Sequence, residues 1–94
     1  MDVGRIQRVR KLLGMSQADI SDLFGLSAAT WNRYEMGHST PSVWLSQMLR
    51  VFEHVAVDPR AAGEFMALRR NNVETPALMW FILDKAYRSR FTPA

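Results

Sequence analysis

The chain has 94 residues, 48% of them apolar, which is enough for one hydrophobic core and too few for two domains of ordinary size. Twelve Lys and Arg residues against nine Asp and Glu residues give a formal net charge of +3, which permits nucleic acid as a partner without requiring it. The lack of cysteine excludes disulfides and thiolate chemistry and suits a reducing cytosol. Two histidines are too few for a His-based site, so we expect no enzyme, no bound metal and no cofactor.

The first half of the chain predicts four helices. Residues 2–13 place apolar side chains on one stripe and basic ones on the other, with the period of an amphipathic helix. Ser16 and Ser27 suit the N-caps of the next two helices, which we expect to run to about Phe24 and Glu35. A glycine stops each of these three helices, and a polar loop precedes a fourth helix over about residues 44–52. The apolar stripe of the first helix is Val3, Ile6, Val9 and Leu13, and that of the fourth is Trp44, Leu45, Met48, Leu49 and Phe52.

The second half predicts two more helices. A fifth helix opens at Asp58-Pro59 and ends near residue 71, and Thr75-Pro76 opens a sixth that continues to about Arg90. The apolar run 77–83 is far shorter than the roughly 18 to 20 residues that cross a bilayer. It could also form a strand.

A dimer interface is expected on the sixth helix. Apolar residues cover nearly every direction around its axis, and a chain of this size can seldom bury such a helix on all sides. The alternative is that these residues belong to the core of the single chain. The expected interface residues are Leu78, Met79, Phe81, Ile82 and Tyr87, with Phe65 and Met66 as further contributors.

Residues 17–36 carry the most specific pattern. Two short helices are joined by Gly25-Leu26-Ser27, so they must cross steeply. Ser21 is small enough to let the second helix approach the first. Such a pair cannot bury itself, and the first and fourth helices supply the rest of its core.

The segment SQADISDLFGLSAATWNRYEMG and the loop, proline and helix that follow it resemble the Xre/Cro-type helix-turn-helix family of phage repressors, over residues 6–55. Phe24, Arg33-Tyr34-Glu35 and Leu49-Arg50-Val51 are also similar to the DNA-binding domain of MqsA-type antitoxins. The resemblance implies an all-α, lambda-repressor-like fold of five to six helices in one domain. Residues 1–57 would form the helix-turn-helix core, and residues 58–94 a helical extension used for dimerisation.

The resemblance also implies which residues meet DNA. In helix-turn-helix docking the N-terminal part of the third helix lies against base edges in the major groove. Arg33 can bond guanine O6 and N7 together, and Asn32 can pair with adenine. The expected base-contact residues are Ser27, Ala28, Ala29, Asn32 and Arg33. The expected phosphate contacts are Ser16, Gln17, Ser39 and Thr40, and Arg5 and Arg8 are further candidates.

Arg10 has a different expected role. It falls within the apolar stripe of the first helix, where a buried guanidinium is costly without a partner. Glu35 is the obvious partner, and the family resemblance places such an Arg and Glu together. We therefore expect Arg10 and Glu35 to form a structural pair.

The leading hypothesis is a cytoplasmic, sequence-specific regulator that binds double-stranded DNA. It would act as a homodimeric repressor on an inverted-repeat operator with half-sites one helical turn apart, and would control its own operon. The main alternative is an antitoxin that binds a toxin protein and regulates its own expression. A regulator associated with anti-CRISPR or restriction genes fits the same residues, and RNA binding and catalysis are less favoured.

Overall fold

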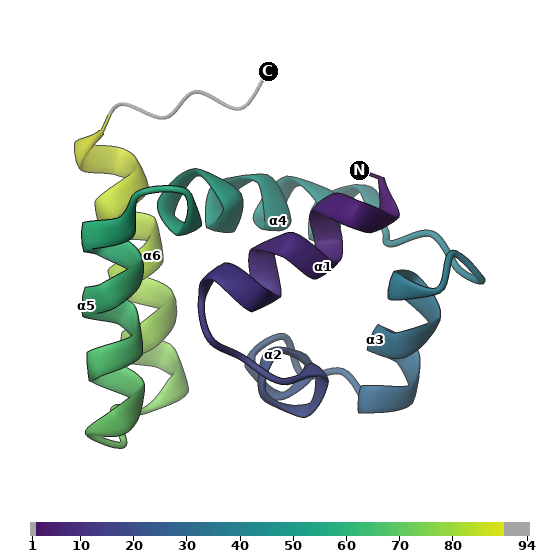
Figure 1. The fold of residues 1–94 in the computed structure, drawn as a ribbon, viewed down its shortest axis with the longest axis horizontal. Helices are drawn as coiled ribbons and strands as arrows, with labels where there is room; N and C mark the ends of the chain where they lie inside the picture. The colour runs from purple at the N-terminus through teal and green to yellow at the C-terminus, as the bar shows by residue number, and fades with distance from the viewer. Residues whose placement is uncertain (1, 90–94) are drawn as a thin grey trace.

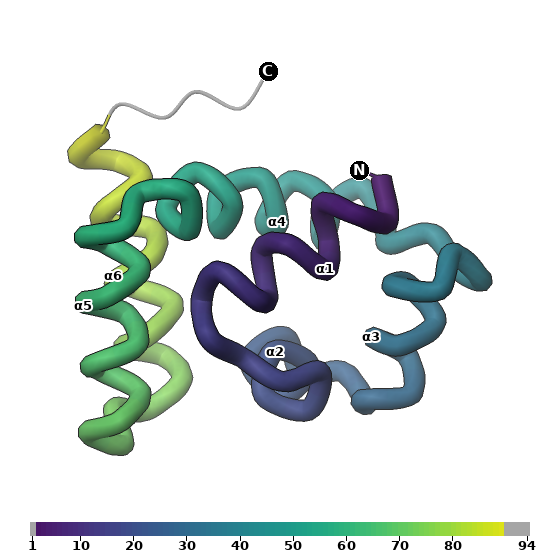
Figure 2. Tube along the Cα trace, viewed as in Figure 1, coloured from purple at the N-terminus to yellow at the C-terminus, as the bar shows by residue number. Residues whose placement is uncertain are grey.

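The computed structural model describes residues 2–89. Six α-helices and no strand occur in this part of the chain, which confirms the all-α prediction (Figure 1). Their bounds are α1 Val3–Leu12, α2 Gln17–Leu23, α3 Ala28–Glu35, α4 Val43–Ala56, α5 Pro59–Arg70 and α6 Thr75–Arg88. The helices α5 and α6 lie side by side at one end of the molecule, α3 lies at the other end, and α1 and α4 run between them (Figures 1 and 2). None of the described helices is long and apolar enough to cross a membrane.

The turn between α2 and α3 is fixed by backbone geometry. Gly25 has φ of +69°, a left-handed conformation that glycine adopts at little cost. The Leu26 N–H donates to the Ser21 carbonyl at 2.8 Å, and the Gly25 N–H donates to the Asp22 carbonyl at 3.1 Å. These two hydrogen bonds close the C-terminus of α2, and Ser27, two residues after Gly25, caps α3. The sequence therefore enforces the steep crossing of the two helices.

One core connects the helix pair with the rest of the chain. The Trp31 side chain of α3 is fully buried, and the Phe24 ring lies 6.0 Å from it and 5.0 Å from the ring of Phe52 on α4. The core continues through Phe65 on α5 to Ile82 on α6, both fully buried. The helix α3 thus packs directly on α1 and α2 and is joined through Phe24 and Phe52 to a core that extends into α5 and α6.

Trp44 corrects the predicted apolar face of α4. Its side chain is 64% exposed, whereas Leu45, Leu49 and Phe52 are buried and Met48 is half-buried. Trp44 lies in the first turn of α4, beside Val43, which is 79% exposed. It is therefore a surface residue.

The start of α6 also differs from the prediction. Glu74, not Thr75, is the N-cap residue, and it makes no side-chain capping bond. Proline near the helix start lacks one of the N–H groups that a cap would satisfy, so the helix needs less capping. The run 77–83 is helical and not a strand, with Leu78 and Ile82 buried four residues apart. The predicted end at Arg90 lies outside the described residues.

Candidate DNA-binding surface

The two sides of α3 differ in burial. Trp31 and Glu35 are buried on its inner side. The outer side consists of exposed residues, which include all five predicted base contacts. These exposed residues are Ser27, Ala28, Ala29, Asn32, Arg33 and Met36. The structure therefore leaves all five predicted base contacts accessible, Ser27 and Ala28 at the start of α3 and the other three along its outer side, and α3 lies at the end of the molecule away from α5 and α6 (Figure 1).

A hydrogen-bond network around Glu35 holds the inner side of α3. Arg10 donates from Nε to Glu35 Oε2 at 2.7 Å and from Nη2 to Oε1 at 3.0 Å. The indole Nε1 of Trp31 donates to Oε2 at 2.6 Å. Arg10 also bonds the carbonyl of Met15, in the connection between α1 and α2. This pairing ties α1, α2 and α3 together.

Glu35 stays ionised because of these bonds. Burial alone would raise the pKa of Glu35, but hydrogen bonds from Arg10, Gln17 and Trp31, together with the charge of Arg10, outweigh burial and lower it. The pKa of Arg10 is raised by its hydrogen bond to Glu35. Both groups are therefore charged at neutral pH, and neither contributes free charge to the surface.

Gln17 takes part in the same network. Its Nε2 donates to Asn32 Oδ1 and to Glu35 Oε1, each at 3.1 Å. Both N–H groups that a phosphate could accept from are thus used within the protein. The bond uses Oδ1 of Asn32 as the acceptor. The amide N–H groups of Asn32 have no partner among residues 2–89 and are the donors that this side chain keeps free. No spacing rule in the sequence pairs residues 17 and 32, so only the folded structure shows this contact.

The sequence model of one family matches residues 1–57, which include α1 to α4. It describes MqsA, the antitoxin component of a bacterial toxin–antitoxin system. The chain belongs to the MqsA antitoxin family. No curated protein and no solved structure matches it.

The other predicted backbone contacts of this MqsA-family chain lie at the two ends of the helix pair. The Ser16 side chain caps α2 in a reciprocal capping box with Asp19, and Ser16 is exposed. Ser39 is half-buried and Thr40 exposed in the loop after α3. Arg5 forms an ion pair with Glu53 on α4, and Arg8 is exposed on α1.

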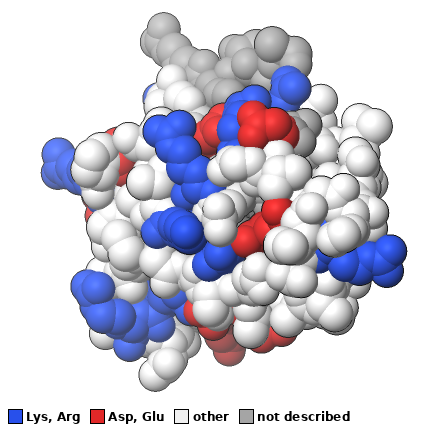
Figure 3. Space-filling view, turned by 45° about the vertical axis from the view of Figure 1, so that its right-hand side comes forward, with Lys and Arg blue, Asp and Glu red and all other residues white. Residues whose placement is uncertain are grey.

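Positive charge on this side of the molecule is dispersed. With the α3 side turned forward, Lys and Arg side chains form separate groups between larger uncharged areas (Figure 3). A surface of this kind offers few cations to any one stretch of DNA backbone, so the affinity of one chain would depend on a small number of contacts.

The predicted dimer residues of α6 separate into two groups. Leu78 and Ile82 are 6% and 0% exposed, in the core of the single chain, so a second chain cannot reach them. Phe65, a further contributor in the prediction, is also fully buried. For these three residues the burial favours the alternative that the sequence left open, membership of the core of the single chain, because α6 turns this side toward α4 and α5. Met66, Met79 and Phe81 are half-buried, and Tyr87 is 83% exposed.

Two exposed apolar residues of α6 were missed by the prediction. Trp80 is 71% exposed and Leu83 is 38% exposed. With Tyr87 they follow the spacing i, i+3, i+7, so they share one side of the helix. We call Trp80, Leu83 and Tyr87 the α6 stripe. Apolar residues point in nearly every direction around the axis of α6, so the sequence does not show which side of the helix faces the core. The α6 stripe therefore could not be identified from the sequence.

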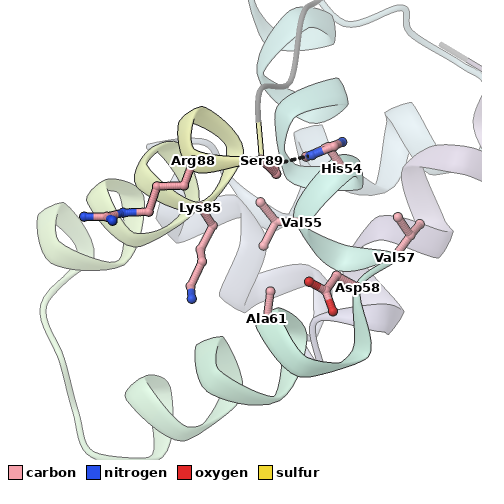
Figure 4. Close-up of a pocket in the computed structure, with 8 residues that line it drawn as sticks. All are labelled: His54, Val55, Val57, Asp58, Ala61, Lys85, Arg88 and Ser89. Atoms are coloured by element: carbon pink, nitrogen blue, oxygen red, sulfur yellow. Dashed lines mark hydrogen bonds between the residues drawn. The ribbon is translucent and has the colours of Figure 1, made fainter.

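A surface pocket of about 530 Å³ lies where the end of α4 meets the start of α5 and the end of α6 (Figure 4). The His54 ring and the Ser89 hydroxyl, hydrogen-bonded to each other, lie at one side of it. Its lining mixes both signs of charge with apolar groups, and none of the predicted DNA contacts belongs to it. The lining residues are His54, Val55, Val57, Asp58, Ala61, Lys85, Arg88 and Ser89.

Proposed function

We propose that this MqsA-family chain is a sequence-specific regulator that binds double-stranded DNA with α3 in the major groove. The observation that carries the proposal is the exposed outer face of α3, held by a buried network on its inner side. A helix that reads bases needs one face free and the other fixed. Family membership supports the same function.

The chemistry of the face suits readout by few hydrogen bonds. Arg33 is exposed and can present its planar donors to guanine O6 and N7. Asn32 is exposed and its Oδ1 accepts from Gln17, so its N–H groups remain available to donate to adenine N7. Ala28 and Ala29 permit close approach and can contact thymine methyl groups. DNA shape would supply part of the specificity.

We also propose a homodimer that represses its own operon from an inverted repeat, with the α6 stripe as the contact between chains. A two-fold contact needs a self-complementary apolar surface, and two exposed large aromatic side chains on one helix provide it. Repression would follow from occupation of the promoter.

The position of α6 sets an expectation for the operator. The chain extends 33 Å along its longest axis, and α6 and α3 lie near opposite ends of that axis. A two-fold axis beside α6 would therefore separate the two α3 helices by more than the roughly 34 Å of one DNA turn. The operator half-sites should accordingly be more widely spaced than the sequence pattern alone suggested.

The experiment is a footprint of the purified protein on the DNA upstream of its own gene. A protected inverted repeat supports the proposal, and half-site centres more than one turn apart support dimerisation through α6. Half-sites one turn apart would instead place the contact near α3, where Met36, Val43 and Trp44 are exposed. If no sequence is protected at low salt, the proposal is wrong.

A second candidate function is toxin neutralisation, which the family match favours. In this case a toxin encoded beside this gene would bind the chain, and DNA binding would serve autoregulation. The test is co-expression: the neighbouring gene product alone should arrest growth, and this chain should relieve the arrest. Growth arrest that persists in the presence of the soluble chain would exclude this function.

A further inference from the structure

The C-terminal end of α5 lies directly against the connection between α1 and α2. Arg69 Nη2 forms an ion pair with Asp19 Oδ2 at 3.0 Å, and Arg69 Nη1 donates to the carbonyl of Gly14 at 3.3 Å. A Cβ at Gly14 would lie 2.8 Å from Met66 Sδ, so the Met66 side chain of α5 packs directly against the backbone of this connection. A hollow of about 330 Å³ lined by Gly14, Met66, Arg69 and Arg70 marks the junction.

The end of α5 is well defined. Asn72 adopts a left-handed conformation with φ of 57°, the Val73 N–H donates to the Leu68 carbonyl at 3.1 Å, and the Asn72 N–H donates to the Arg69 carbonyl at 3.0 Å. The Asn71 side chain bonds the Ala67 carbonyl. This closing pattern satisfies the last carbonyls of the helix. Arg69 and Arg70 therefore extend from a fixed backbone.

This junction lies beside the start of α2, where two of the predicted phosphate contacts, Ser16 and Gln17, are found. Asp19 is in the first turn of α2, two residues after Gln17 and three after the N-cap Ser16. In Figure 1 the turn between α5 and α6, the helix α2 and the start of α3 all lie along the lower edge. A DNA duplex along this edge would meet both the start of α3 and the turn that follows α5.

The two arginines at the junction differ in their partners. Arg69 is half-buried and its charge is balanced by Asp19, which together suit it to hold α5 in place. Arg70 is exposed, and no ion pair to it occurs among residues 2–89. Arg70 is thus an exposed cation on a well-defined helix end, where it lines the hollow with Gly14, Met66 and Arg69.

We propose that Arg70 contacts the phosphate backbone of double-stranded DNA, outside the bases that α3 reads. The proposal rests on the DNA-binding function proposed above and adds a contact from α5, beyond the residues that the family model matches. Arg69 acts as a positioning residue through Asp19 and Gly14. The guanidinium of Arg70 donates to phosphate oxygens, which carry no base identity, so the contact adds affinity without specificity.

The test measures binding by fluorescence anisotropy, with the footprinted operator and with a scrambled duplex, between roughly 50 and 200 mM salt. Arg70→Ala should weaken binding to both duplexes by a similar factor and reduce the slope of log K against log salt by about 0.9 for each chain bound. The matched control is Arg60→Ala, which removes the same charge at the other end of α5, where Arg60 is exposed. It should leave the slope unchanged.

The outcomes separate the two proposals. If the wild-type chain binds and Arg33→Ala abolishes its preference for the operator, while Arg70→Ala behaves like Arg60→Ala, then Arg70 is a solvated residue and only this inference fails. If the wild-type chain binds neither duplex, the proposed function fails as well. Circular dichroism melts of each variant show whether a lost slope reflects lost folding, which the exposure of Arg70 argues against.

Discussion

Replacing Glu35 by alanine should strongly destabilise the fold. The substitution removes the carboxylate that accepts hydrogen bonds from Arg10, Gln17 and Trp31. The Arg10 side chain is only 13% exposed, so its charge would remain largely buried and lose its partner. The indole N–H of Trp31, in a fully buried side chain, would also lose its acceptor.

The expected loss follows from burial. Removing one partner of a buried ion pair costs about 3 to 5 kcal/mol. Arg10 keeps its bond to the Met15 carbonyl and some contact with water, which favours the lower end of that range. The expected loss of unfolding free energy is therefore about 3 kcal/mol, with a fall in Tm of roughly 12 to 24 °C for a chain of this size.

Urea denaturation and thermal melts followed by circular dichroism measure this loss. Asp84→Ala is the control, because it breaks the exposed ion pair with Arg88 and should cost less than about 0.5 kcal/mol. The double variant Arg10→Met with Glu35→Leu should be more stable than Glu35→Ala, because no charge stays buried. A loss below about 1 kcal/mol for Glu35→Ala would refute the reasoning.

Three further predictions concern acid stability, the helix pair and assembly. The pKa of Glu35 is lowered in the folded state, so its contribution to stability is fully present above the ordinary glutamate pKa and is lost as the pH falls below that value and through the lowered pKa of the folded state. Urea denaturation from neutral to acid pH should therefore show a shallower decline of the unfolding free energy for Glu35→Gln than for the wild-type chain. Gly25→Ala should lower the unfolding free energy by about 1 to 2 kcal/mol because Gly25 has a positive φ. Gly63→Ala should raise it by about 0.5 to 1 kcal/mol, because Gly63 lies inside α5 with open space around it. Equal Tm values for the two variants would contradict this. Trp80→Ser should shift light scattering toward the monomer mass while Trp44→Ser, at the other large exposed indole, should not, and a monomeric wild-type chain at micromolar concentration would exclude the dimer.

Local signals in the sequence were sufficient to predict most of the fold. Two local features illustrate this: the N-caps Ser16 and Ser27, and the apolar stripe of α1. Each depends only on residues within one or two helical turns, so it can be recognised directly in the sequence. The exposure of Asn32 and Arg33 likewise follows from the burial of Trp31 on the opposite side of α3.

Contacts between distant segments could not be predicted in the same way. The bond from Gln17 to Asn32 depends on the crossing angle of α2 and α3. The burial of Ile82 and the exposure of Trp80 depend on which side of α6 faces α4, and an apolar helix carries no sequence signal for that choice. The ion pair from Arg69 to Asp19 joins the extension to the helix pair across 50 residues of sequence.

The measurement that tests the central claim most directly is the preference of the chain for its operator over a scrambled duplex. Dissociation constants for the operator and for a scrambled duplex should be measured with the wild-type chain, Arg33→Ala and the control Arg60→Ala. The account predicts that Arg33→Ala lowers the ratio between the two duplexes by roughly 5- to 150-fold, the equivalent of one bidentate guanine contact, while Arg60→Ala preserves it. An unchanged ratio in folded Arg33→Ala would contradict the claim that α3 reads the bases.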